Sequence, residues 1–436
     1  MANLTPFRIV LLAFFVALGI GSLIMLGAYQ ASVSKDSKIY GDQVVIWGTF
    51  GQQEMVALFQ DVRENNKAFE VVQYREFNKD TFESELVNAI AEGRGPDLIM
   101  MSSEQMVTLR PKMLALPYET LPLRTIKDLY VDGVEIFTFP AGTYAIPFAV
   151  DPLVLYWNRD LFASNGLAEA PATWEEVVNL VVPNITVVDD RHNIIQSALA
   201  FGEYRNLVNP KAILLTLAMQ SGSQMIYLNG GSYEVGLDRH VEIASKKRPL
   251  QLAMEFFTDF SNANSQLYTW NRVQQNDKNA FLAGELAMYF GLASEYRDIS
   301  NKNPNLNFDV APMPQGSTAT IKRTYGNFYG FAIPKASYNP DGAYQAVLTL
   351  TSPEFAAKLA SQYTMISPRR DVIAQGDLDP VIQGAMNASL IARGWLDPSA
   401  EQTDAILQEM VENVVSNRER INQAVGDTLK RIERVF

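Results

Sequence analysis

The sequence predicts an α/β protein of two large lobes or about three domains, preceded by one membrane-spanning helix. At roughly 150 residues per domain, a chain of 436 residues is too long for a single small module. Short apolar runs alternate with helical patterns through the first part of the chain, as in a sheet covered by helices. An uninterrupted apolar stretch precedes this alternation. With 47% hydrophobic and 19% charged residues, the chain can bury a large core and is not disordered.

The apolar stretch at residues 9–28 has Ser22 as its only polar side chain. At about 1.5 Å per residue, a helix of this length crosses a hydrocarbon core of about 30 Å. A cleaved signal peptide is the alternative. Its apolar region is usually about 7–15 residues long and ends in a small-x-small site, which residues 26–31 fit poorly. We therefore expect an uncleaved signal anchor at residues 9–28, followed by a linker at residues 29–39.

The body of the protein begins with regularly alternating elements. Strands are predicted at residues 44–47, 71–74 and 96–101, and helices at residues 54–62 and 79–92. This order predicts an α/β sheet whose ligand loops lie at the carboxyl ends of its strands.

Two extended runs, at residues 145–150 and 153–157, meet at Asp151 and Pro152 without a turn signal. This pattern is typical of a strand that leaves one lobe for another. Thr173 and Glu176 then have the spacing of a capping box at a helix start.

The rest of the chain returns to sheet before it ends in helix. Residues 205–260 are predicted to be mostly helical, interrupted by a turn at Asn229-Gly230-Gly231. The remaining predictions are extended runs at 308–312 and 328–334, a helix at 341–350, and an amphipathic helix over 403–436 that packs on its own lobe.

Composition excludes several classes of function. A formal charge of -12 argues against a nucleic-acid partner, whose phosphates need basic side chains. The absence of cysteine removes disulfides, thiolate nucleophiles and iron–sulfur clusters. His192 and His240 have no spaced ligand partner, so we expect no metal site. No nucleotide-binding or serine-hydrolase motif is present, and no cofactor is expected. A glycosidase pair among the many carboxylates stays open.

Five segments carry a resemblance to a known family. They are residues 92–99 with the following Glu104-Gln105, residues 144–162, residues 171–176, residues 280–288 and residues 329–335. In order and spacing these segments resemble family 1 of the bacterial extracellular solute-binding proteins, the maltose-binding type. Members of this family are the substrate-binding subunits of ABC importers. The resemblance spans nearly the whole body.

The resemblance implies a periplasmic-binding-protein type II fold, in which two hinged lobes close on a ligand. Lobe 1 would comprise residues 40–150 plus 312–352, and lobe 2 residues 151–311 plus 353–436, with a hinge near residues 149–151. Such proteins work outside the inner membrane, so residues 1–8 would be cytoplasmic. The implied partners are an ABC transporter permease and a small solute, here a mono- or oligosaccharide. No enzymatic activity is implied.

Sugar recognition needs aromatic faces for apolar ring surfaces, and carboxylates or amides for hydroxyls. Matched positions and residue types together give the candidate ligand-binding residues Thr49, Phe50, Glu104, Gln105, Asp151, Trp270, Gly291, Tyr296, Tyr325, Asn327 and Trp395.

One segment departs from the family pattern. Gly291 is followed by Leu292-Ala293-Ser294, where the family often continues to a tryptophan that stacks on sugar. Tyr296, Trp270 and Trp395 are alternative platforms. A solute other than a sugar (a peptide, a polyamine or a metal complex) is one rival hypothesis, and a glycosidase-like enzyme or a tethered sensor is another.

Overall fold

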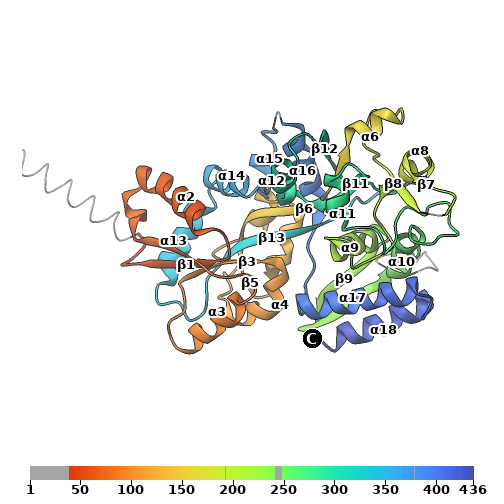
Figure 1. The fold of residues 1–436 in the computed structure, drawn as a ribbon. Helices are drawn as coiled ribbons and strands as arrows, with labels where there is room; N and C mark the ends of the chain where they lie inside the picture. Colours follow the sequence, from red (N-terminus) through yellow and green to blue (C-terminus); the bar gives the residue numbers. More distant parts are fainter. Residues whose placement is uncertain (1–38, 192, 241–247, 378) are drawn as a thin grey trace, which may run out of the picture. The chain divides into compact units, whose positions relative to one another are not determined.

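A computed structural model of the chain describes residues 39–191, 193–240, 248–377 and 379–436 (Figure 1). The chain divides into two compact units. Unit 1 comprises residues 39–99 together with Ala336–Thr349, and unit 2 comprises Met100–Lys335 and Leu350–Phe436. The predicted anchor at residues 9–28 lies outside the described residues. Within the described ranges, no helix is long and apolar enough to cross a membrane.

Unit 1 is built on a parallel sheet. Its central strand β1 (Val44–Gly48) pairs with β2 (Val72–Glu76) on one side and with the beginning of β3 (Leu98–Ser102) on the other. Its helices are α2 (Gln52–Asn65), α3 (Phe82–Ala91) and α13, which runs from Pro340 to Leu350 at the end of the unit. The alternation of strands and helices predicted for this region is confirmed.

The side chain of Asp97 ties the ends of unit 1 together. Its Oδ2 accepts a hydrogen bond from the backbone N–H of Val45 at 3.0 Å. Its Oδ1 accepts from the Ser337 hydroxyl at 2.9 Å and from the backbone N–H of Asn339 at 3.2 Å. Asp97 of the family-like segment therefore has a structural role, because its side chain joins β1 to the returning segment before α13.

Unit 2 contains a mixed sheet around one long strand. The strands run in the order β13 (Thr324–Ala332), β6 (Ile146–Asn158), β11 (Leu286–Leu292), β8 (Ile194–Leu199) and β7 (Val187–Val188). β12 (Phe308–Pro312) also pairs with β6, and β14 (Ala392–Arg393) with β13. All residues of β6 are buried, which is typical of a strand covered on both faces.

β6 changes its partners halfway along. Its first half pairs with β13 as far as Pro152, whereas the half from Leu153 onward pairs with β11 and β12. Proline cannot donate a ladder hydrogen bond, so it is tolerated best where a strand changes neighbours, as β6 does at Pro152. The two extended runs predicted on either side of Asp151-Pro152 thus form one strand, as expected.

Helices and two hairpins complete unit 2 (Figure 1). The hairpins are β4 (Thr138–Phe139) with β5 (Gly142–Thr143) and β9 (Ser223–Asn229) with β10 (Ser232–His240). The helices are α4 (Met106–Leu109), α5 (Leu123–Leu129), α6 (Arg159–Ser164), α7 (Trp174–Glu176), α8 (Val182–Ile185), α9 (Pro210–Gln220), α10 (Pro249–Asp259), α11 (Asp277–Leu282), α12 (Tyr296–Lys302), α14 (Pro353–Gln362), α15 (Arg370–Ile373), α16 (Pro380–Ile391), α17 (Ala400–Val415) and α18 (Ile421–Glu433). The capping box at Thr173 is confirmed, since its side chain accepts from the backbone N–H of Glu176.

The prediction that residues 205–260 are mostly helical is wrong in its middle part. Strands β9 and β10 occupy 223–229 and 232–240. The Asn229-Gly230-Gly231 turn is their hairpin loop, with φ of 56° at Gly230 and 95° at Gly231. Two glycines in succession permit the left-handed backbone that a tight hairpin needs.

The single helix predicted over residues 403–436 is also wrong. The structure has two helices, α17 and α18, which lie side by side in unit 2 (Figure 1). Asn417 lies between them with a φ of 56°, a conformation that asparagine tolerates better than most residues. The apolar spacing continues through this break, so periodicity alone did not reveal it.

Candidate functional site

Four polar side chains from separate parts of unit 2 form one network. The Tyr325 hydroxyl on β13 donates to Glu104 Oε1 at 2.8 Å. Lys211 Nζ, in the first turn of α9, lies 3.6 Å from the same oxygen and 2.9 Å from Asp397 Oδ2. Two of the predicted ligand residues, Glu104 and Tyr325, are therefore brought together, and Lys211 joins them to Asp397.

The turn after β3 positions Glu104. The backbone N–H of Ser102 donates to Gln105 Oε1 at 2.9 Å, so Gln105 closes the turn with its own side chain. The Ser103 hydroxyl donates to Asn327 Oδ1 at 2.9 Å and accepts from the backbone N–H of Phe328 at 3.1 Å. These bonds join the turn to β13, so Glu104 and Tyr325 are carried by linked elements.

Lys211 is a cation at an unfavourable end of a helix. The first turn of a helix carries partial positive charge, so a lysine there needs nearby carboxylates. Burial by itself would lower the pKa of Lys211, but the charges of Glu104 and Asp397 more than offset it, and the net pKa is raised. Lys211 therefore stays protonated at neutral pH.

Tyr325 and Asp397 form the buried part of the network. Burial and the neighbouring Glu104 raise the pKa of Tyr325 well above its ordinary value, so its hydroxyl keeps its proton. The Asp397 side chain is 0% exposed, and Asp397 Oδ1 accepts from the Thr403 hydroxyl at 2.7 Å. The indole Nε1 of Trp395, two residues before Asp397, is buried without a partner in the described part of the chain.

Asp151 and Asn327 lie opposite each other on β6 and β13. Asp151 is 1% exposed. Its Oδ1 accepts from the backbone N–H of Ser294 at 2.9 Å, and its Oδ2 accepts from the Ser294 hydroxyl at 2.6 Å. Ser294 belongs to the segment after Gly291, where this chain lacks the tryptophan that the family often has. In this chain that segment instead binds the acid at the predicted hinge.

A second network adjoins the start of α9. Asn209 Nδ2 donates to Glu295 Oε1 at 2.8 Å, and the Tyr289 hydroxyl donates to Glu295 Oε2 at 2.6 Å. Lys278 Nζ lies 2.9 Å from Glu295 Oε2. Because Asn209 is two residues before Lys211, both networks meet at the amino-terminal end of α9.

Gly291, another predicted site residue, lies on β11 beside this second network. A Cβ at this position would come within 2.5 Å of the Tyr289 ring, 3.0 Å of the Tyr156 ring and 3.1 Å of Glu295 Oε1. The two tyrosines leave no room for a side chain at this position, so packing alone explains why the residue is glycine.

The remaining predicted residues belong to other elements of the structure. Trp270 is 1% exposed, and its backbone N–H donates to the carbonyl of Phe260. Tyr296 is half-buried in α12, with its ring 5.7 Å from that of Phe308. Thr49 and Phe50 belong to unit 1, where they follow β1, and the Phe50 carbonyl accepts from the Tyr74 hydroxyl at 2.6 Å. Their ligand-binding roles stay predictions.

Sequence reasoning missed Lys211, Asp397 and Ser294. The Asn209-Pro210 pair is a helix-start signal, and a lysine directly after it indicates a cation that needs carboxylate partners. No local signal indicates that Asp397, nearly two hundred residues further on, supplies one of them. Within the described ranges, no group of three or more histidine, aspartate or glutamate side chains is arranged to hold a metal ion.

Comparisons with known proteins identify relatives of this chain. The family model described as bacterial extracellular solute-binding protein matches residues 53–357. A binding protein of Brucella abortus (strain 2308) is 21% identical over 354 residues, which cover 80% of this chain and 78% of the relative. The maltotriose-binding protein of Pyrococcus abyssi (strain GE5 / Orsay) is 21% identical over 384 residues, 86% of this chain and 77% of the relative.

Two solved structures have a similar fold. A cyclo/maltodextrin-binding protein complexed with maltotetraose gives a TM-score of 0.72 at 17% identity, covering 90% of this chain and 97% of the other. An ABC transporter solute-binding protein from Thermotoga lettingae TMO, bound with α-D-tagatose, gives a TM-score of 0.65 at 18% identity. The match covers 91% of this chain and 100% of the other. These likenesses show that the chain has the α/β fold of solute-binding proteins.

Proposed function

Because the chain belongs to the bacterial extracellular solute-binding proteins, we propose that it captures a carbohydrate outside the cell membrane and delivers it to an ABC permease. The observation that carries this proposal is the network of Glu104, Tyr325 and Lys211. The side chains of Glu104 and Lys211 are 23% and 15% exposed, so a ligand can reach them without unfolding. The family and the relatives named above are binding proteins, so catalysis is not part of the proposal.

The chemistry of the network suits hydroxyl groups. A carboxylate accepts hydrogen bonds, an ammonium group donates them, and a tyrosine hydroxyl does both. Each buried sugar hydroxyl needs such a partner, since an unpaired one costs about 1–3 kcal/mol. Relatives named for maltotriose and maltodextrin, and a solute-binding protein bound with tagatose, support a sugar as the solute.

Capture would follow from closure of the predicted lobes, 40–150 plus 312–352 and 151–311 plus 353–436. The exchange of strand partners at Pro152 in β6 supports a hinge at this point, because each half of the strand belongs to a different set of neighbours. Closure over a solute would satisfy its hydroxyls from two sides and give a form that the permease recognises.

Residues 9–28 would tether the binding protein to the membrane beside its permease. Tethering confines the carrier to the membrane surface, so its effective concentration at the permease rises without any new contact. The free energy for transport would come from the ATP-driven partner.

The experiment that tests solute capture is thermal unfolding of the whole chain in mild detergent, against panels of saccharides, peptides, polyamines and metal complexes. A ligand at about 100 times its Kd adds about 2.7 kcal/mol of stability. We expect stabilisation by saccharides without product formation, and about tenfold weaker binding in Glu104→Gln, whose side chain no longer carries the charge that faces Lys211. Glu401→Gln, an exposed substitution in α17, is the matched control.

Each result has a defined meaning. Stabilisation by peptides, polyamines or metal complexes with no response to sugars would reject the carbohydrate assignment and keep the binding protein. Product release from a saccharide would replace capture by an enzymatic activity. No response to any panel would reject solute capture and favour a tethered sensor.

A further inference from the structure

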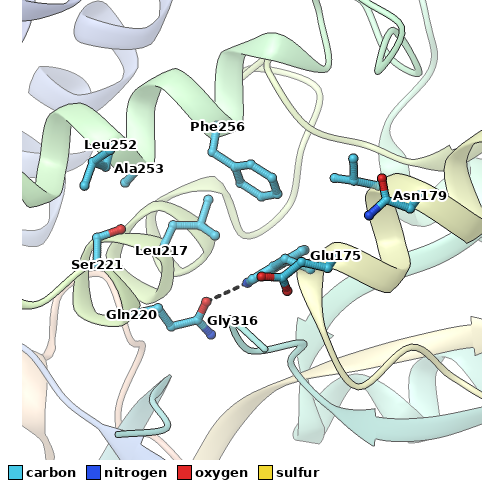
Figure 2. A pocket seen from close by; sticks show the side chains of 11 residues that line it. Glu175, Asn179, Leu217, Gln220, Ser221, Leu252, Ala253, Phe256 and Gly316 are labelled. Carbon is cyan, nitrogen blue, oxygen red and sulfur yellow. Dashed lines mark hydrogen bonds between the residues drawn. The ribbon is translucent and has the colours of Figure 1, made fainter. Parts of the chain in front are cut away.

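A pocket with a volume of about 370 Å³ lies among three helical segments of unit 2 (Figure 2). Leu217 near the end of α9 and Phe256 in α10 form an apolar side. Glu175 in α7 and Asn179, in the helical segment that follows, form the opposite side. Small-molecule sites in proteins typically measure about 300–1,000 Å³ and combine an apolar surface with a few polar groups. The size and the lining of this pocket both fit that description.

This pocket is separate from the candidate solute site. Lys211, which belongs to the Glu104 network, is near the beginning of α9, whereas Gln220 at the pocket is its last residue. Nine residues of α-helix at 1.5 Å each place these two positions about 14 Å apart along the axis, and Leu217, the lining residue of α9 nearest in sequence to Lys211, is about 9 Å from it along the axis. A ligand in this pocket would therefore not occupy the Glu104 network.

A rare helical geometry forms one side of the pocket. Val177–Val181 is a π-helical turn inserted between α7 and α8. It supplies Val178 and Asn179 to the lining. Single π turns within helices are uncommon and are found frequently at functional sites. This turn is a second observation, independent of the pocket volume, that points to a binding role.

The floor of the pocket is held rigidly. Trp174 Nε1 donates to Gln220 Oε1 at 2.7 Å, a bond drawn in Figure 2. Gln220 Nε2 donates in turn to the carbonyls of Pro314 at 3.0 Å and Arg323 at 2.9 Å. The Phe256 ring packs edge-on against Trp174, with centroids 5.3 Å apart. A ligand would meet a preformed aromatic surface and would not need to order these side chains, which lowers the cost of binding.

The charge of the pocket is negative. Among the described residues that line it, Glu175 alone is charged. Its carboxylate accepts from the backbone N–H of Ser317 at 3.0 Å and from the Ser317 hydroxyl at 2.9 Å. Hydrogen bonds from its own backbone and from Ser317 lower the pKa of Glu175, so it is ionised at neutral pH. A cation complements this lining, and aromatic faces add to the attraction.

We propose that this pocket binds a small cationic aromatic compound, with its ring against Phe256 and Leu217 and its ammonium group beside Glu175. Neither the solute-binding family nor the proposed carbohydrate capture requires such a site. The proposal is independent of the identity of the transported solute.

Isothermal titration of the whole chain in mild detergent, with three compounds that share one ring, tests the charge assignment. Tryptamine carries a cation, indole is neutral and indole-3-acetate carries an anion. We expect tryptamine to bind with a Kd of about 1 mM or below, indole at least about fivefold more weakly, and indole-3-acetate more weakly still. Absence of tryptamine binding, or equal binding of indole-3-acetate, would overturn the proposal.

Substitutions at two positions locate the binding. Among the described residues, a Cβ at Gly316 would come within 4 Å of the Cβ of Ala319 alone, at 3.8 Å, so a side chain can be added there. Gly316→Phe should fill the pocket and weaken tryptamine binding at least about tenfold, whereas Gly316→Ala should leave it within about twofold. Tryptamine binding retained by a folded Gly316→Phe protein would place the ligand elsewhere and reject this pocket.

The surface substitution Glu175→Gln provides a second test of the pocket if Gly316→Phe disturbs folding. It should weaken tryptamine binding about fivefold and leave indole binding unchanged, because only the charge is removed. Glu401→Gln removes an exposed carboxylate from the first turn of another helix, α17, and should change the binding of neither tryptamine nor indole. An equal loss of tryptamine affinity in Glu175→Gln and Glu401→Gln would show a general charge effect and would overturn the proposal. Saccharide titrations of the same variants keep this test distinct from that of solute capture.

Discussion

At the scale of single residues, Lys211 is the charge on which the candidate site depends. Removing it leaves Asp397, which is 0% exposed, without its ion-pair partner. Breaking a buried pair from one side costs about 3–5 kcal/mol, and the partial exposure of Glu104 and Lys211 reduces this. We expect Lys211→Met to lower the free energy of unfolding by about 2–3 kcal/mol in urea titrations.

The matched control is Lys302→Met, which removes a cation from an exposed pair with Asp298. That pair should contribute less than about 0.5 kcal/mol. In the folded state the pKa of Lys211 is raised above its ordinary value of 10.5. The stabilisation that the Lys211 ion pairs provide is therefore complete below pH 10.5 and is lost as the pH rises through the pKa of the folded state. Equal stability losses in both variants would argue against a special role for Lys211.

Asp277, at the start of α11, carries the clearest pH dependence. Burial raises its pKa from 3.8 to about 7, although the backbone N–H groups of Lys278 and Val208 donate to it. Between pH 3.8 and about pH 7, the folded state therefore binds more protons at Asp277 than the unfolded state does. The free energy of unfolding therefore falls as the pH rises from about 4 to about 7.

Asp277→Asn keeps an acceptor for both N–H groups and removes the titration. The full shift corresponds to about 4 kcal/mol, part of which relaxation of the site removes. We expect the variant to be about 1–2 kcal/mol more stable than the natural protein at pH 8 and equally stable near pH 4. Urea unfolding at several pH values measures this difference. A constant difference across the pH range would contradict the assigned titration.

At the scale of elements, two glycines in regular structure have opposite surroundings. Gly291 on β11 is packed against Tyr289 and Tyr156, whereas a Cβ added at Gly426 in α18 would meet nothing within 4 Å in the described part of the chain. Gly291→Ala should cost about 1–3 kcal/mol by overpacking. Gly426→Ala should add about 0.5–1 kcal/mol, since alanine favours helix. Thermal unfolding of both variants checks the signs, and a stabilising Gly291→Ala would contradict the packing argument.

Most elements were predictable because their signals are local. Apolar runs and turns gave the strands and helices of unit 1, and the Thr173–Glu176 spacing gave the start of α7. The two errors have physical causes. In the β9–β10 region a helical interpretation outweighed the Gly230-Gly231 hairpin signal, and at Asn417 the apolar period runs through a chain reversal. A left-handed residue interrupts a helix without interrupting the hydrophobic pattern.

At the scale of the whole molecule, the solute-binding fold was predictable and the details of the site were not. Glu104 and Tyr325 were predicted separately, and the structure joins them. Their link through Lys211 to Asp397 depends on residues that are distant in sequence, which no local pattern encodes. The segment after Gly291, which lacks the tryptophan that the family often has, likewise makes a tertiary contact that no local pattern encodes, because Ser294 binds Asp151.

The membrane tether is the remaining prediction for the whole molecule. Residues 9–28 are apolar enough to insert as a helix, and the partition of a twenty-residue apolar segment into lipid is effectively irreversible. The complete chain should therefore stay with the membrane pellet after alkaline carbonate extraction, which removes peripheral proteins. A chain lacking residues 1–28 should appear in the supernatant with unchanged solute affinity. Intact-mass measurement of the complete chain distinguishes retention of the segment from cleavage. Recovery of the complete chain in the supernatant would reject the tether and leave solute capture standing.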